Sequence, residues 1–418
     1  MKKVLLYVFI ITPFLSYSQE ELVLPKVKKN SIYLNSYISI ESNNLNTNFL
    51  NSMLYGGFIT DEIKDNWINS GDEKNRLNAE FTNYLKYEFL NKYSNSFYFQ
   101  FSDVNYVNCN FKDDLLKLSL YGNYDYLGDT LDFSETSIRI DRYQQYKLGY
   151  NYNILKNNIN WSITTALSFL NGNHHMQLNI DKGSLYTSEM GTSLDLNYHI
   201  KSMMTDTSDF SPFVGNGNGI AMDFSLKITK ETDIWEMSIR DLGYIKWKEN
   251  SIINNTDNNL NFTGVEIQDF NNLPDFNDSI LDMSFSQQTK SFKSFIPARI
   301  TLSYNTILKH RFIKNICIAT HSRWQPYYVT GSINSDLINR GLKESGYMNR
   351  LDINTLIDAK YLYTTVGINR GGFTDKTNLH FNIRDKKGIC TIGSYHLNDF
   401  FKNDKNSASV YFSLTQRF

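Results

Sequence analysis

The chain has 418 residues, of which 41% are hydrophobic and 15% aromatic, with 28 Tyr and 28 Phe. Its formal net charge of −1 shows no global polybasic character, so we expect no nucleic-acid partner. Beyond the N-terminal region no stretch approaches the roughly eighteen consecutive apolar residues of a transmembrane helix. A chain that is rich in aromatic residues yet has a mean hydropathy of −0.42 fits a β-barrel in which half of each strand faces lipid.

Residues 1–18 have the three parts of a secretory signal peptide. Lys2 and Lys3 form a short basic start, residues 4–15 form an apolar run, and the small residues Ser16 and Ser18 follow. This pattern predicts export and cleavage before Gln19. No cysteine lies near the cleavage site, so we expect no lipid anchor.

Residues 19–78 form an irregular N-terminal segment. It holds an alternating stretch at residues 31–41, then Asn-rich sequence, then a weak helical pattern over residues 61–69. Two interpretations stay open. The segment is a plug in the lumen or hangs in the periplasm, or residues 31–41 are simply the first barrel strand. We therefore divide the chain into a signal peptide (1–18), this segment (19–78) and a barrel (79–418).

From Ala79 to Phe418, apolar and polar residues alternate repeatedly with a period of two. Such alternation is typical of strands whose two faces meet different surroundings. Several stretches reach about nine to eleven residues, the length that a tilted membrane strand needs. The alternating stretches include residues 97–101, 146–154, 159–169, 176–180, 194–200, 224–228, 234–240, 300–308, 379–383 and 389–395.

Short polar stretches that suit tight hairpins separate some of these strands, at residues 156–158, 385–387 and 402–406. Longer connections occupy residues 201–217, 250–293 and 331–349. An antiparallel barrel with both ends in the periplasm needs an even strand number, and the alternation gives about fourteen strands, between roughly twelve and sixteen. The sequence thus predicts an all-β fold, a transmembrane antiparallel β-barrel in the outer membrane, surrounded by lipid and inserted by the barrel-assembly machinery.

Three stretches of the chain resemble a known family. They are a Gly-Asn repeat with the strand that follows it, the run SIRDLGYIKW, and a Pro-Ala-Arg that opens another strand, at residues 215–230, 238–247 and 297–299. In these stretches the chain resembles an uncharacterised family of Bacteroidota outer-membrane proteins. That family is similar in turn to fatty-acid-transporter-like barrels, which include the PorV and PorQ components of the type IX secretion system. The resemblance implies a barrel of about fourteen strands and no settled activity, because fold alone does not give function.

The second of these stretches has a physical interpretation of its own. Arg240, Asp241 and Gly243 end an alternating strand, where a glycine permits a bulge and the charged pair is placed to meet inside the lumen or at its rim. Trp247 suits an aromatic belt at the membrane interface. We expect these four residues to form a structural corner. The alternative is that Arg240 and Asp241 line a substrate path.

The last ten residues are typical of the closing strand of an outer-membrane barrel. They alternate with period two and stop on an aromatic carboxyl-terminal residue. One face suits water and carries Ser409, Ser413, Thr415 and Arg417. The other suits lipid and forms the predicted insertion strand, with Val410, Phe412, Leu414 and Phe418.

No pattern in the sequence predicts an enzyme, a cofactor or a metal site. Cys109, Cys317 and Cys390 are far apart and odd in number, which favours three isolated thiols. The rings of His174 and His175 would point to opposite faces of a strand, and we expect this pair in a surface loop. Outer-membrane phospholipases use a Ser–His pair, but no nucleophile signature accompanies His199, His321, His380 or His396.

Three functions remain as hypotheses. The first is a non-enzymatic barrel that acts as an accessory or assembly component of a cell-envelope machine for secretion or surface display, together with other envelope proteins. The second is a transporter of hydrophobic small molecules across the outer membrane. The third is a secreted soluble β-protein such as an adhesin.

Overall fold

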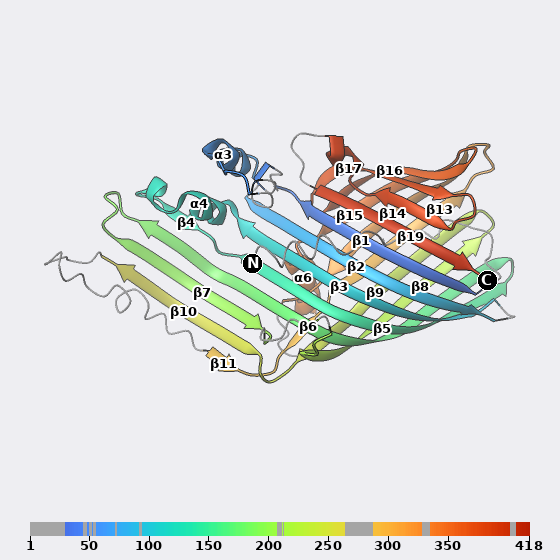
Figure 1. Cartoon of the computed structure of the whole chain (residues 1–418), viewed down its shortest axis with the longest axis horizontal. Helices are drawn as coiled ribbons and strands as arrows, with labels where there is room; N and C mark the ends of the chain where they lie inside the picture. Colours follow the sequence, from blue (N-terminus) through green and yellow to red (C-terminus); the bar gives the residue numbers. More distant parts are fainter. Residues whose placement is uncertain are drawn as a thin grey trace.

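The computed structural model describes residues 30–44, 48–49, 52, 56–71, 73–91, 94–206, 211, 213–263, 287–327, 335–401 and 407–418. The expected signal peptide (1–18) and the expected turn at residues 402–406 lie outside them. The described chain is dominated by long strands (Figure 1). The strands are β1 (Ser31–Ser42), β2 (Lys74–Leu90), β3 (Ser96–Lys112), β4 (Thr130–Asp132), β5 (Thr136–Lys156), β6 (Ile159–Thr187), β7 (Leu194–Met204), β8 (Gly217–Lys230), β9 (Asp233–Trp247), β10 (Ile252–Phe262), β11 (Gln287–Thr289), β12 (Lys293–Phe295), β13 (Ala298–Ile307), β14 (Ile313–Trp324), β15 (Met348–Asp358), β16 (Leu362–Gly372), β17 (Lys376–Asp385), β18 (Cys390–Ser394) and β19 (Ser407–Arg417). The helices are α3 (Asp61–Asn69), α4 (Asp113–Tyr121), α6 (Ser335–Glu344) and the 3-10 turns η1 (Tyr124–Tyr126) and η2 (Leu397–Phe401).

Fourteen strands close into one antiparallel ring. The ring runs β1, β2, β3, β5, β6, β8, β9 and then β13 to β19. The strands β4, β7, β10, β11 and β12 extend the sheet at the barrel end that carries the long connections. It closes where β19 pairs with β1, from Ser31 opposite Arg417 to Glu41 opposite Ser407. The predicted antiparallel barrel of about fourteen strands is therefore confirmed.

The N-terminal segment contributes strands to the ring. β1 pairs with β19 on one side and β2 on the other, so residues 31–41 form the first barrel strand. β2 begins at Lys74, and the boundary expected between residues 78 and 79 falls inside it. The alternation is hard to recognise there because Asn75 and Asn78 lie on opposite faces of β2 and are both buried, and asparagine is depleted in ordinary strands. The weak helical pattern at residues 61–69 is helix α3.

The short turns lie at one end of the barrel, together with the first and last described residues. Asn157 and Asn158 join β5 to β6 with φ of 50° and 61°, as two-residue hairpin turns require. The backbone N–H of Phe418 donates to the Asn30 carbonyl at 3.0 Å. The opposite end carries the long connections with α3, α4 and α6. Outer-membrane barrels have short periplasmic turns and long outer loops, so the short-turn end faces the periplasm.

The barrel has the polarity of a membrane protein, with buried polar side chains inside and exposed apolar side chains outside. Its most buried residues include Glu80, Arg139, Gln144 and Asp352. Its exposed large apolar residues include Ile38, Leu85, Phe99, Leu148, Leu167, Ile220, Phe224, Met237, Leu302, Ile318, Ile353, Ile368, Ile392 and Val410. No helix within the described ranges is long and apolar enough to cross a membrane. A closed ring satisfies every backbone group without water, so this barrel spans the outer membrane.

One side of the barrel continues far beyond the membrane as a flat wall. β6 has 29 residues, about three times the length that spans a bilayer. Its first half pairs with β8, and its second half pairs with β7, which pairs in turn with β10 (Figure 1). The stretches 159–169 and 176–180 are therefore one strand, and 194–200 lies in the wall. The expected long connection at residues 250–293 contains β10 and β11.

A charge on the outer face of the closing strand tests the membrane assignment. Phe412 lies near the middle of β19 and Gln416 near its periplasmic end, both on the outer face. We expect Phe412→Arg to destabilise the folded barrel by roughly 2–4 kcal/mol and Gln416→Arg by about 1 kcal/mol or less, because the cost of a charge falls towards the interface. Urea titration in lipid vesicles measures both. Equal effects of the two variants would contradict the assignment.

Candidate functional site in the barrel lumen

Ion pairs join opposite walls of the barrel through its lumen. The Glu80 side chain on β2 is 1% exposed and accepts hydrogen bonds from Arg299 on β13 and Arg323 on β14, the latter at 2.8 Å. Five ring strands separate β2 from β13 on one side, and six separate β2 from β14 on the other. A carboxylate and two guanidinium groups can meet in this way only where the walls approach within two side-chain lengths. The cross-section is therefore closed at this level.

Aromatic rings surround the Arg323 guanidinium. Its carbon lies 5.7 Å from the Tyr106 ring centre, 5.3 Å from Tyr347 and 5.2 Å from Phe373. Such cation–π contacts stabilise a charge that is removed from water. The cavities near Arg299 measure about 40 and 60 Å³, which is room for a few water molecules. The lumen at this level is packed like a protein core.

A second buried ionic group lies above the first. Arg139 and His175 both contact Asp141, through Arg139 Nε and His175 Nδ1, each at 2.7 Å. Arg139 also donates to the Phe295 carbonyl. His174 and His175, expected in a surface loop, lie in β6, and His175 is buried. That expectation was wrong because a bulge opposite Arg142 and Tyr143 turns His175 into the lumen.

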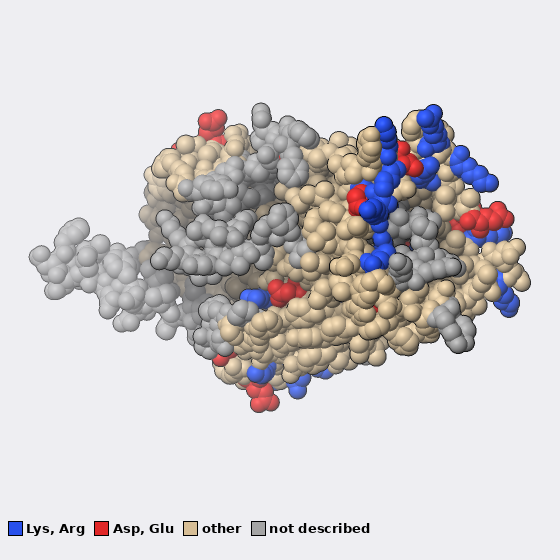
Figure 2. All heavy atoms as spheres, turned by 45° about the vertical axis from the view of Figure 1, so that its right-hand side comes forward, with Lys and Arg blue, Asp and Glu red and all other residues tan. Residues whose placement is uncertain are grey.

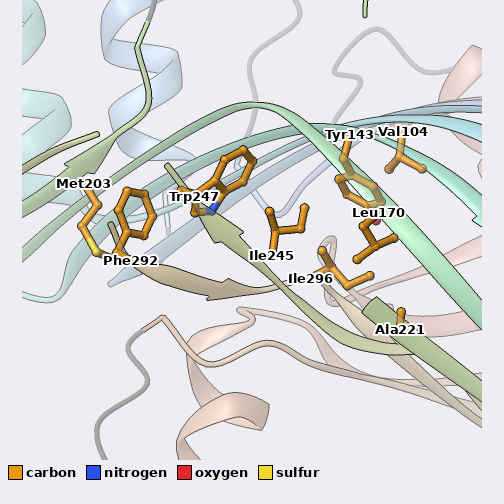
Figure 3. Packing of buried hydrophobic residues seen from close by; sticks show 9 residues of the cluster. All are labelled: Val104, Tyr143, Leu170, Met203, Ala221, Ile245, Trp247, Phe292 and Ile296. Atoms are coloured by element: carbon orange, nitrogen blue, oxygen red, sulfur yellow. The ribbon is translucent and has the colours of Figure 1, made fainter. Parts of the chain in front are cut away.

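An apolar cluster covers this ionic group. The His175 ring stacks against Trp247 with centroids 5.3 Å apart, and Trp247 Nε1 donates to Ser294 Oγ at 2.8 Å. Phe292 lies against His175 on another side, at 5.2 Å between centroids. Figure 3 shows that the cluster runs along the inside of the wall from Met203 to Ala221. Side chains from β3, β5, β6 and β9 meet there with Phe292 and Ile296, so apolar packing covers the inner face of this wall.

The described residues that directly follow β14 contact the far wall through Tyr327. The Tyr327 hydroxyl lies 2.9 Å from Asn108 Oδ1 and 3.1 Å from Ser137 Oγ, on β3 and β5. Gln177 on β6 donates to the Tyr327 carbonyl at 3.1 Å. Leu337 of α6 packs behind it against Phe295, Ala298 and Trp324. Tyr327 thus links the end of β14 to the wall formed by β3, β5 and β6.

The predicted corner at residues 240–247 is a β-bulge. Arg240 and Asp241 together oppose Asp223 on β8, and Asp241 has a φ of 59°. A side chain at Gly243 would place its Cβ 2.2 Å from the Ile220 carbonyl oxygen, so only glycine fits. Before the bulge the odd-numbered residues of β9 face lipid, and after it they face the lumen. Trp247 is therefore 1% exposed, and its expected place in an interfacial belt was wrong.

The bulge places the Asp241 side chain in a third buried ionic group. Lys147 Nζ lies 2.5 Å from Asp223 and 3.0 Å from Asp241, and Gln145 donates to Asp241 at 2.9 Å. Arg240 lies 3.8 Å from Glu236 on the same strand. Asp241 thus tethers β9 to β5. Its partners Lys147 and Gln145 were not identified from the sequence.

The residues of the predicted insertion strand lie where the alternation placed them. Val410 is 45% and Phe418 53% exposed on the outer face, and Phe412 and Leu414 lie on the same side of β19. Ser409, Ser413 and Thr415 are buried on the inner face. The Phe418 ring stacks on Tyr87 at 5.9 Å between centroids. The aromatic terminus therefore lies at the seam between the last and the first strands.

The described lumen holds hydroxyl–imidazole contacts, at Thr301 with His321 and at Ser409 with His396. His396 Nδ1 lies 3.0 Å from Ser409 Oγ, and both residues are buried. The same hydroxyl oxygen accepts the Tyr395 backbone N–H at 2.9 Å. Over the described ranges no group of three or more His, Cys, Asp or Glu residues is arranged to hold a metal ion. The pair has the geometry of a structural hydrogen bond inside a packed wall.

The sequence analysis missed the residues that fill the lumen. Some carried a usable signal, because Arg139 with Asp141 and Arg350 with Asp352 stand two apart on strands and so share a face. Charged residues repeated on one face of a membrane strand indicate an inner face. The sequence carried no signal for the pairing of Glu80 with Arg299 and Arg323, because more than 200 residues separate Glu80 from either arginine in the chain.

Replacing the Glu80 carboxylate tests the bridge. We expect Glu80→Gln to lower the free energy of unfolding by roughly 3–5 kcal/mol, because two guanidinium groups then stay buried without a negative partner. The matched variant is Glu236→Gln, whose carboxylate lies half-exposed 3.8 Å from Arg240. Loss of the Glu236 carboxylate should lower the free energy of unfolding by about 1 kcal/mol or less. Urea titration of both variants in lipid vesicles measures these changes. Equal losses of stability would contradict a stabilising role of the Glu80 bridge.

Comparisons with solved structures return β-barrels of low similarity. A "TodX deltaS2S3 mutant monoaromatic hydrocarbon channel" has a TM-score of 0.44 at 9% identity, over 94% of this chain and 91% of that chain. The toluene transporter TodX of P. putida has a TM-score of 0.39 at 8% identity, over 94% and 90%. The translocator domain of autotransporter NalP from Neisseria meningitidis has a TM-score of 0.34 at 5% identity, over 94% and 89%. At such scores these likenesses carry no functional argument.

No curated protein matches the sequence significantly. One family model does, and it covers nearly all of the barrel. The match runs over residues 25–405, from just before β1 to just before the closing strand. The chain belongs to the family described as "Family of unknown function (DUF5723)".

Proposed function

We propose that the protein is a non-enzymatic outer-membrane barrel that serves as an accessory or assembly component of a cell-envelope machine. The observation that carries this proposal is the closed lumen. Opposite walls are joined by the hydrogen bonds of Glu80 with Arg299 and Arg323. The Tyr327 hydroxyl makes a further contact across the lumen, with Asn108. A filled barrel offers no continuous aqueous path to a solute, so its surfaces remain for function.

The outer wall supports this role. β6, β7 and β10 form a hydrogen-bonded sheet that extends beyond the membrane on one side (Figure 1). A sheet held by backbone hydrogen bonds can present a surface to another protein without the entropy cost of ordering a loop. Residues 215–304 resemble an uncharacterised Bacteroidota family that is similar in turn to barrels such as PorV and PorQ, and this resemblance points in the same direction.

One observation bears on the alternative function, the transport of hydrophobic small molecules. An apolar hollow of about 430 Å³ lies on the outer face of β8, β9, β13 and β14, with Trp235, Leu302 and Tyr304 in its lining. Behind it, β9 and β13 pair continuously from Arg240 opposite Arg299 to Asp233 opposite Thr306. The hollow therefore opens to lipid and has no passage through this wall. We favour the accessory role for that reason.

Electrical recording tests the closed lumen. In planar bilayers the protein should carry no steady current. The triple variant Glu80→Ala, Arg299→Ala and Arg323→Ala should conduct more, because the side chains that bridge the walls are gone. The double variant Glu236→Ala and Arg240→Ala is the control and should stay closed. A steady current through the unmodified protein would contradict the proposal, and heat-modifiable gel mobility verifies that each variant is folded.

Native purification tests the accessory role. An affinity tag inserted after Met190, which is exposed at the tip of the β6–β7 hairpin, leaves the closing strand intact. We expect the tagged protein to bring down the same envelope proteins at a fixed ratio from native membranes. Recovery of the barrel alone, or with insertion machinery only, would contradict the accessory role. A deletion strain that loses uptake of hydrophobic compounds would favour the transporter.

A further inference from the structure

Three neighbouring turns at the periplasmic end carry an excess of positive charge. They join β13 to β14, β15 to β16 and β17 to β18. Four exposed cations lie on them, one or two to a turn, and we call this set the basic rim: Lys309, Arg311, Lys360 and Lys387. They lie beyond Ile313 and Leu362, the last exposed apolar residues of their strands. Figure 2 shows Lys and Arg side chains gathered on this end of the molecule.

The carboxylates among these turns are already engaged. Asp358 bridges Lys314, at 3.3 Å, and Lys386, and its backbone N–H donates to the Phe312 carbonyl. Asp385 accepts the backbone N–H groups of its own turn, including that of Lys387 at 2.9 Å. These contacts tie the three turns into one surface. Among the described residues, the four cations of the basic rim have no carboxylate within ion-pair distance.

Aromatic side chains lie between these cations. Tyr361 is 73% exposed and Phe312 is 52% exposed. The Lys360 ammonium lies 5.0 Å from the Tyr361 ring centre, and the Arg311 guanidinium lies 5.1 Å from that of Phe312. Exposed Arg, Tyr and Phe are enriched at protein–protein interfaces relative to other surfaces. The surface thus combines unpaired charge with apolar anchors.

The basic rim occupies one arc of the barrel end. On another arc, the β5–β6 and β8–β9 hairpins carry one exposed cation each, Lys156 and Lys230, and the acidic residue Glu231 follows Lys230. Lipid headgroups surround a barrel evenly, so a device for holding them has no reason to be concentrated on one arc. A docked protein contacts one side. Charge complementarity then requires acidic residues on that protein.

We propose that the basic rim docks an acidic segment of a periplasmic protein. This rests on the proposed accessory role and names the chemistry of one partner. Asp and Glu side chains of the segment pair with Lys309, Arg311, Lys360 and Lys387, and an apolar residue packs against Tyr361 or Phe312. Because the pairs are exposed at a rim, binding weakens steeply with added salt.

The test uses the full chain in nanodiscs of phosphatidylcholine and a fluorescent ten-residue peptide of Asp and Glu. Fluorescence anisotropy should show binding at low salt. The variant Arg311→Ser with Lys360→Ser should weaken it by roughly tenfold. The control removes the same charge from the same end, with Lys156→Ser and Lys230→Ser, both exposed. It should change affinity by less than about twofold.

Equal loss in the two variants, or no peptide binding, would overturn the proposal. So would unchanged peptide binding together with a loss of phosphatidylglycerol retained from mixed-lipid nanodiscs, because the rim would then hold lipid. Native purification separates this proposal from the accessory role. If the rim variant recovers the same partners as the unmodified protein, only the acidic docking site fails. If the unmodified protein recovers none while the peptide binds the rim, the accessory role fails.

Discussion

Backbone hydrogen bonding in lipid is the constraint on which this structure depends. A membrane offers no water to an unpaired strand edge, so a sheet that crosses it must close. Closure here occurs between β1 and β19, and it requires the irregular N-terminal segment to supply the first strand. Once the ring is closed, every strand has one face in lipid and one in the lumen. The alternation of the sequence and the polarity of the barrel follow from this.

The lumen departs from that of a water-filled pore. Its inner faces carry acidic and basic residues that meet each other across the barrel, as Glu80 meets Arg299 and Arg323. Burying charges costs free energy unless each is paired and hydrogen-bonded, and these groups are joined to partners and rings. The bulges at Asp241 and opposite Arg142 and Tyr143 turn further side chains inward. The described part of the lumen is therefore packed with paired side chains.

The alternation of the strands made much of this fold predictable. It placed Val410, Phe412 and Leu414 on the outer face and gave the strand number, while a separate helical pattern indicated the helix at residues 61–69. It failed where a single inserted residue reverses the faces, as for Trp247 and His175, because a bulge leaves no mark in a period of two. It also could not pair Glu80 with Arg323, since side-chain contacts across a lumen depend on the shape of the closed ring.

The central claim is that ion pairs between opposite walls close the lumen. The most direct measurement is an experimental structure of the protein in lipid nanodiscs, with side-chain density in the barrel interior. We expect continuous density from Glu80 to Arg299 and Arg323, and Tyr327 in contact with Asn108. An open lumen, in which water separates Glu80 from both guanidinium groups, would contradict it.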